Sequence, residues 1–164
     1  IACVSEWSFD VNRRRFLMAG GAIVATGAVA TAGYAWRLGY FDPPVEAQLT
    51  PPEALERVKA GELLLIDIRR PDEWARTGVP AGAAPLDMRR SDFVPALQAL
   101  MQDDDRIPVA IICARGVRSR RVSNLLEQAG FTQIIDIPEG MLGSKAGPGW
   151  VARGLPVDPP PAAS

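Results

Sequence analysis

The stretch of sequence that decides the fold reads Ile107-Pro108-Val109-Ala110-Ile111-Ile112-Cys113-Ala114-Arg115-Gly116-Val117-Arg118-Ser119. Its first half is short and apolar, which is the pattern of a strand buried on both faces of a parallel sheet. Its second half is a short loop that contains glycine and arginine. Apolar residues at helical spacing follow, at Val122, Leu125, Leu126 and Ala129. A buried strand that leads through a cysteine into a helix predicts a ligand site at the carboxyl edge of a parallel sheet.

The rest of the soluble region shows the same alternation of strands and helices. Leu63–Asp67 and Gln133–Ile137 are further apolar runs of strand length. Thr50 and Glu53 have the spacing of a capping box around a short helix, and Asp92–Met101 has helical spacing of its apolar residues. We therefore predict an α/β domain with a mainly parallel central sheet flanked by helices on both faces, preceded by one N-terminal hydrophobic helix.

Composition excludes several functional classes. The 164 residues are 48% hydrophobic and 23% charged, which fits one globular domain, and the net charge of −1 gives no general attraction to nucleic acid. The absence of histidine removes the usual general base of a cysteine or serine nucleophile and the commonest metal ligand. The two cysteines, Cys3 and Cys113, are too few for a thiolate metal site. We expect no metal, no other cofactor and no nucleic-acid partner.

The N-terminal region has the pattern of a targeting segment. Asn12-Arg13-Arg14-Arg15-Phe16-Leu17-Met18 resembles a twin-arginine export signal, and a run of small apolar residues continues to Trp36. The 21 residues from Phe16 to Trp36 can span a bilayer core of about 30 Å as a helix. Small-residue cleavage patterns end at Ala30 and Ala32, so both membrane anchoring and cleavage stay open, and the aromatic residues near Trp36 favour retention. The segment predicts a location in the bacterial cell envelope, on the periplasmic side, anchored in the inner membrane or released after cleavage.

These patterns divide the chain into five segments. They are a leader and arginine-rich region (1–15), a hydrophobic signal or anchor helix (16–36), a linker (37–48), the α/β domain (49–157) and a tail that we expect to be disordered from Val157 onward (158–164).

Cys113 is the candidate nucleophile. A short loop between a strand and a helix directs backbone N–H groups inward, and the helix N-terminus adds partial positive charge. Helix N-termini and nearby cations favour the thiolate form of a cysteine, so no histidine base is required. Arg115 and Arg118 lie on this loop and can hold an anionic substrate, whereas we expect Arg120 and Arg121 to face solvent from the helix.

Several separate segments resemble the rhodanese family, over about Leu49 to Val157. The family's active-site loop, Cys-x-x-Gly-x-Arg-Ser, corresponds to Cys113–Ser119, and its Asp-x-Arg-x-x-x-Glu signature corresponds to Asp67–Glu73. The resemblance continues through Ala129-Gly130-Phe131, Glu139-Gly140, Trp150 and Gly154-Leu155-Pro156-Val157. One departure is the segment Thr77–Ala83, which lacks the histidine that many members carry.

The resemblance implies a thiosulfate sulfurtransferase-like enzyme. Cys113 would take the outer sulfur of a small anionic donor such as thiosulfate, and a thiol or cyanide would remove this sulfur from the resulting persulfide. The implied substrate-binding residues supply loop N–H groups and the Ser119 hydroxyl, while Arg115 and Arg118 orient the donor or brace the loop; the set is Ala114, Arg115, Gly116, Val117, Arg118 and Ser119. Asp67, Arg69 and Glu73 form a structural signature.

Two other functions compete with this one. Tyrosine-phosphatase-type enzymes also use a cysteine at a strand end, but they need five residues between cysteine and arginine, and only four separate Cys113 from Arg118. A non-catalytic or redox-sensing module, tethered to the membrane and binding a partner protein, is the second alternative. The cysteine and the two loop arginines favour chemistry over this interpretation.

Overall fold

The computed structural model describes residues 45–102 and 106–161. The leader, the twin-arginine motif, the hydrophobic segment 16–36, Cys3 and the last three residues lie outside this range, as does most of the linker. Within the two described ranges, no helix is long and apolar enough to cross a membrane.

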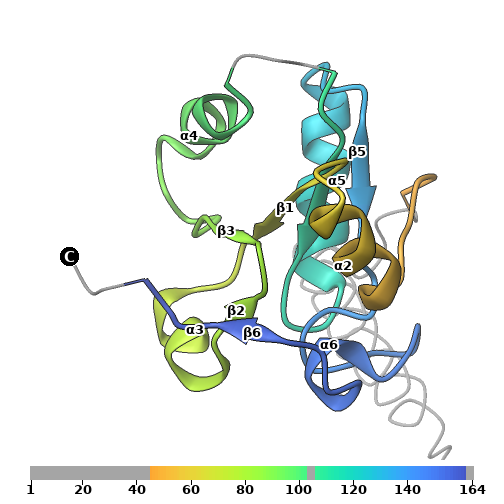
Figure 1. Cartoon of the computed structure of the whole chain (residues 1–164). Helices are drawn as coiled ribbons and strands as arrows, with labels where there is room; N and C mark the ends of the chain where they lie inside the picture. The colour runs from red at the N-terminus through yellow and green to blue at the C-terminus, as the bar shows by residue number, and fades with distance from the viewer. Residues whose placement is uncertain (1–44, 103–105, 162–164) are drawn as a thin grey trace, which may run out of the picture. The chain divides into compact units, whose positions relative to one another are not determined.

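A four-stranded parallel sheet forms the centre of the domain, with the strand order β3-β1-β4-β5 (Figure 1). Its strands are β1 (Leu64–Asp67), β3 (Ala84–Pro85), β4 (Val109–Ile112) and β5 (Ile134–Asp136). Next to β5, Gln48 makes a parallel bridge to Asp136 and so continues the sheet by one isolated pairing. The predicted parallel sheet is confirmed, with each of its three longer strands inside the apolar run that predicted it.

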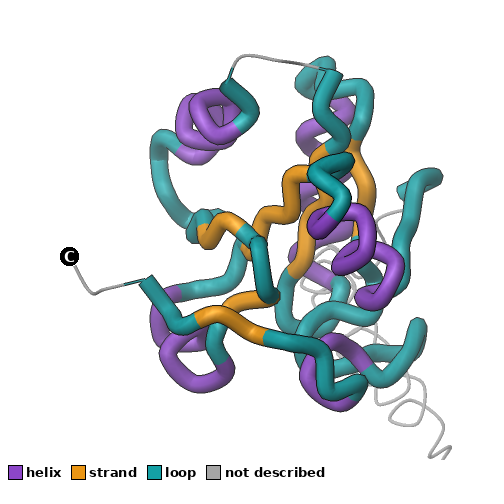
Figure 2. The backbone as a smooth tube through the Cα atoms, viewed as in Figure 1, coloured by secondary structure: helices purple, strands orange, loops and turns teal. Residues whose placement is uncertain are grey.

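Helices pack on both faces of this sheet, also as predicted (Figure 2). Val109 and Ile111 of β4 join one core cluster, which includes Leu97 and Leu126. Ala110 and Ile112 point to the other cluster, because successive side chains of a strand alternate between faces. The first cluster contains residues of α4 (Phe93–Leu100) and α5 (Val117–Gln128), and the second contains residues of α2 (Pro51–Lys59) and α6 (Gly149–Ala152).

The predicted cap of α2 is present. The backbone N–H of Thr50 donates to the Glu53 carboxylate at 2.8 Å, and Pro51 occupies the first helical position. Hydrogen bonds from Thr50 hold the pKa of Glu53 below its usual value.

The structure adds a helix that the sequence analysis did not predict, α3 (Pro71–Thr77). Pro71 begins it, and the backbone N–H of Arg70 donates to the Glu73 carboxylate at 3.1 Å. The helix places Glu73 six residues after the end of β1.

The expected disorder from Val157 onward is wrong at its beginning. Val157 and Asp158 form β6, which pairs antiparallel with β2 (Val79–Pro80) in a small second sheet. Proline is tolerated there because this two-stranded sheet has only edge strands. The Asp158 carboxylate also accepts a hydrogen bond from the Gly82 N–H at 2.8 Å, so the end of the domain is fixed by pairing that the proline-rich sequence did not indicate.

Candidate functional site

Cys113 directly follows β4, at the carboxyl edge of the parallel sheet. Its side chain is buried, with 1% of its surface exposed, and it is a free thiol. Its carbonyl accepts a hydrogen bond from the Met141 N–H at 2.9 Å, and the next carbonyl, of Ala114, accepts one from Leu142 at the same distance. These two bonds attach the start of the loop to the segment that follows β5.

Gly116 allows the loop to turn into α5. Its φ of +79° lies in the left-handed region, and a Cβ at this position would come within 2.1 Å of the Pro138 carbonyl oxygen. Gly140 meets the other side of the loop, where a Cβ would lie 2.7 Å from the Ala114 backbone. The loop and the segment after β5 are therefore packed backbone against backbone, with glycine on each side.

Ser119 brings a hydroxyl group to the thiol from the first turn of α5. Its Oγ lies 3.6 Å from Cys113 Sγ and 3.2 Å from the Gly116 carbonyl oxygen, and the side chain is buried. The Ser119 hydroxyl can therefore donate to a sulfur anion at Cys113 or to the loop carbonyl.

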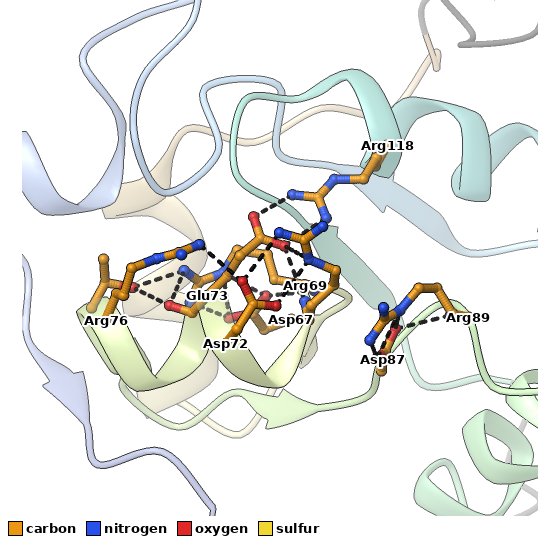
Figure 3. Close-up of polar contacts among 10 residues, drawn as sticks. Asp67, Arg69, Asp72, Glu73, Arg76, Asp87, Arg89 and Arg118 are labelled. Carbon is orange, nitrogen blue, oxygen red and sulfur yellow. Dashed lines mark hydrogen bonds and ion pairs between the residues drawn. The ribbon is translucent and has the colours of Figure 1, made fainter.

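Arg118 is held by Glu73 of α3 (Figure 3). Its Nη1 and Nη2 donate to the two carboxylate oxygens at 2.8 and 2.7 Å, a bidentate geometry. Burial raises the pKa of Glu73, but hydrogen bonds from Arg118 and the Arg70 N–H, together with both arginine charges, outweigh it and bring the pKa to about 2. The bond to Glu73 raises the pKa of Arg118, and negative charge at Cys113 contributes in the same direction.

Asp67 and Arg69 form a buried ion pair near this contact (Figure 3). Arg69 Nη2 donates to Asp67 at 2.6 Å and to the Gly78 carbonyl at 2.7 Å, while Nη1 donates to Thr77 Oγ1 at 2.8 Å. The pair therefore joins the end of β1 to the end of α3, the helix that carries Glu73. The three residues grouped from the sequence do lie together, and the direct contact between Glu73 and Arg118 was not predicted.

Arg115 takes a different position from Arg118. It is exposed and lines a cavity of about 570 Å³ between the Cys113 loop and the segment after β5. Arg120 lines the same cavity and is half-buried, so the expectation that it faces solvent is wrong. Arg121 is exposed as expected.

Asp136, at the end of β5, is a residue of this region that the sequence analysis missed. It lines the same cavity, and only 1% of its surface is exposed. Burial raises its pKa to about 6, although hydrogen bonding by Ser119 and the Arg120 charge act in the opposite direction. The available signal was a single aspartate in the apolar run Gln133–Ile137, which places a carboxylate in a buried strand.

Comparison with known proteins identifies the family. A family model described as the rhodanese-like domain matches residues 50–146, which include β1, the Cys113 loop and the segment after β5. The chain belongs to the rhodanese-like domain family. An uncharacterized protein of Rickettsia prowazekii is 28% identical over 102 residues, covering 56% of this rhodanese-like chain and 80% of the relative.

Two solved structures show the same rhodanese-like fold. A polysulfide-sulfur transferase homodimer from Wolinella succinogenes has a TM-score of 0.60 at 23% identity, covering 80% of this chain and 91% of the other. A protein of unknown function from Rhodopseudomonas palustris, described as a possible tyrosine phosphatase, has a TM-score of 0.52 at 24% identity, covering 68% and 84%. At these identities the likeness concerns the fold alone.

Proposed function

We propose that this rhodanese-like protein is a sulfurtransferase that carries sulfane sulfur as a persulfide on Cys113. The observation that carries the proposal is the position of the thiol at the end of β4, 3.6 Å from the Ser119 hydroxyl. Helix α5 begins four residues later, and its N-terminus favours negative charge at the loop. A sulfur anion is thus favoured there without a histidine.

The first half-reaction forms the persulfide from an anionic donor such as thiosulfate. The Cys113 thiolate attacks the outer sulfur, the sulfur–sulfur bond of the donor breaks, and sulfite leaves with the electron pair. The negative charge then resides on the outer sulfur of the persulfide, where the Ser119 hydroxyl and the N–H groups from Ala114 to Ser119 can stabilise it. Each half-reaction is completed before the next substrate reacts, so the kinetics are ping-pong.

The second half-reaction transfers the outer sulfur to an acceptor. A thiol or cyanide attacks that sulfur, the persulfide bond breaks, and Cys113 recovers its thiolate. Cyanide becomes thiocyanate in this step, and a thiol becomes a persulfide.

The two loop arginines take different roles in this proposal. Arg118 is engaged with both oxygens of Glu73, so it braces the loop and contributes charge from a fixed position. Arg115 is exposed and makes no ion pair among the residues that the structure describes, so it is the cation available to orient an anionic donor.

A phosphatase is the second candidate, because the Rhodopseudomonas protein is described as a possible tyrosine phosphatase. Four residues separate Cys113 from Arg118 here, one fewer than such enzymes need to surround a tetrahedral oxyanion. The engagement of Arg118 by Glu73 further weakens this candidate, since its planar group is already paired.

Steady-state assays separate the candidates. With thiosulfate and cyanide we expect thiocyanate formation with parallel double-reciprocal plots, and no hydrolysis of p-nitrophenyl phosphate above the Cys113→Ser background. Phosphatase turnover that depends on Cys113, without thiocyanate formation, would reverse the assignment. If the protein shows neither activity, the non-catalytic or redox-sensing module that binds a partner protein becomes the favoured function.

The location outside the cytoplasm is a separate proposal. It is supported by the twin-arginine-like motif at Arg13 and Arg14 and by the apolar run that follows. Fusing residues 12–40 to a folded reporter should send the reporter to the bacterial envelope, and replacing Arg13 and Arg14 by lysine should block this. A soluble, uncleaved reporter in the cytoplasm would contradict the proposal.

A further inference from the structure

The cavity beside the Cys113 loop is lined by two parts of the chain. Arg115, Gly116 and Arg120 line it from the loop and α5, while Asp136 and Lys145 line it from β5 and the segment that follows. Its volume of about 570 Å³ lies within the range of roughly 300–1,000 Å³ typical of small-molecule sites. Size alone therefore permits a small ligand.

The buried end of the cavity offers a hydrogen-bond acceptor. Asp136 is 1% exposed, and its Oδ1 has no hydrogen-bond partner among the described residues. A buried carboxylate oxygen without a donor is unfavourable unless a bound group supplies one. The raised pKa of Asp136 agrees with this, because burial prevails over the Ser119 hydroxyl and the Arg120 charge.

The outer part of the cavity offers two cations. Arg115 and Lys145 are both exposed, and neither makes an ion pair among residues 45–102 and 106–161. They come from the two separate walls, so a carboxylate between them would meet positive charge from both. A ligand that suits this cavity carries a donor at its inner end and an anion at its outer end.

We propose that this cavity binds the α-amino-acid group of a small zwitterion, with the ammonium on Asp136 and the carboxylate between Arg115 and Lys145. Ser119 relates this cavity to the sulfur, since its Oγ lies 3.6 Å from Cys113 Sγ and its side chain acts to lower the pKa of the buried Asp136. The zwitterion is the head group of the acceptor, a thiol of the cysteine type; this part rests on the proposed sulfurtransferase function. The acceptor thiol would attack the outer sulfur of the Cys113 persulfide, giving the acceptor's persulfide and the free Cys113 thiol.

Binding can be tested without sulfur chemistry, using S-methylcysteine as the probe and the full chain in isothermal titration calorimetry. Two matched probes each lack one charge: 3-(methylthio)propionate has no ammonium, and 2-(methylthio)ethylamine has no carboxylate. We expect S-methylcysteine to bind at least tenfold more tightly than either. Its affinity should rise as the pH increases from 5 to 7, because the Asp136 carboxylate forms in this range; the other charged groups that line the cavity are Arg115, Arg120 and Lys145.

Two variants assign the charges to residues. Asp136→Asn should lower the S-methylcysteine affinity at least tenfold and abolish its pH dependence. The weaker binding of the propionate should not change. Lys145→Ala, on the exposed wall, should weaken S-methylcysteine and the propionate but not the amine. Lys59→Ala, an exposed lysine on α2, is the control and should leave all three unchanged.

Three results would overturn the inference. They are equal affinity for the three probes, no binding of any probe, and an S-methylcysteine affinity that does not change in Asp136→Asn. The result is independent of persulfide formation, because no probe carries a thiol. Persulfide formation without zwitterion binding would overturn this inference alone. Zwitterion binding without persulfide formation would support the binding site itself but would overturn the proposal that its ligand is the sulfur acceptor.

Discussion

Glu73 accepts two hydrogen bonds from Arg118 across 45 positions of sequence, at 2.7 and 2.8 Å. This contact joins α3, which is anchored to β1 by Asp67 and Arg69, to the first turn of α5 behind the Cys113 loop. The family signature and the loop motif are thus parts of one arrangement, in which buried charges hold the loop in place.

Removing the Glu73 carboxylate should change the acid stability of the protein. The pKa of Glu73 in the folded protein is about 2, below its usual value of 4.5, so its contribution is complete above pH 4.5 and is lost as the pH falls toward 2. Urea unfolding of the wild type should show this loss of stability between pH 4.5 and 2, and Glu73→Gln should not show it. Glu62→Gln, an exposed carboxylate, is the control; an equal effect there would contradict the role of the Arg118 contact.

Breaking the buried pair should cost more than breaking an exposed pair of the same spacing. Asp67→Ala leaves the Arg69 charge buried without its main partner, so we expect about 3–5 kcal/mol of destabilisation in chemical unfolding. Asp87 and Arg89 have the same i,i+2 geometry, but Arg89 is exposed. Arg89→Ala should therefore cost much less than Asp67→Ala, because water screens the exposed pair, and equal costs would refute the argument from burial.

Gly116→Ala should disrupt the loop. The substitution requires a left-handed alanine and also places Cβ against the Pro138 carbonyl. Gly61 has a similar φ of +72°, and a Cβ there would meet no atom within 4 Å, so Gly61→Ala isolates the backbone cost of about 1–2 kcal/mol. Thermal unfolding should show a larger loss for Gly116→Ala, together with loss of sulfur transfer, and similar losses in the two variants would speak against the close backbone approach.

Two buried serines of α5 should behave differently. Ser119 lies beside Cys113, whereas Ser123 Oγ has no hydrogen-bond partner among the described residues. Ser119→Ala should slow persulfide formation about tenfold. Removing a donor from an oxyanion hole slows a reaction roughly 10²–10³-fold, and we expect a smaller effect here because sulfur is a weaker hydrogen-bond acceptor than oxygen. Ser123→Ala should leave the rate unchanged and keep or raise stability, since it removes an unsatisfied buried hydroxyl. Stopped-flow measurements of both variants with thiosulfate check this, and equal rates in both variants would remove Ser119 from the chemistry.

The sequence was sufficient for the three longer strands of the central sheet and for α2, α4 and α5, because they lie in continuous apolar runs or have helical spacing; the short β3 has no such pattern. It was insufficient where a partner far along the chain decides the structure. Val157 and Asp158 have the surroundings of a disordered tail, and only their pairing with β2 makes them a strand. α3 does have a local signal, Pro71 followed by Glu73, but these residues also belong to the family signature, which does not by itself indicate where a helix begins.

The site divides in the same way. Cys113, the loop and Ser119 follow from a contiguous motif, so they could be predicted together. The engagement of Arg118 by Glu73 and the burial of Asp136 depend on how β1, β5 and α5 meet, and spacing in the sequence does not encode this. Asp136 in particular is buried beside residues 47–49, whose bridge to β5 has no pattern of its own.

The most direct test is the intact mass of the full chain after treatment with thiosulfate, followed by cyanide. The two cysteines provide matched controls: Cys3→Ser should gain one sulfur atom and lose it to cyanide, as the wild type does, and Cys113→Ser should gain none. That result would establish Cys113 as the sulfur carrier. No gain in the wild type with thiosulfate or with a persulfide donor, or an equal gain in Cys113→Ser, would contradict the account.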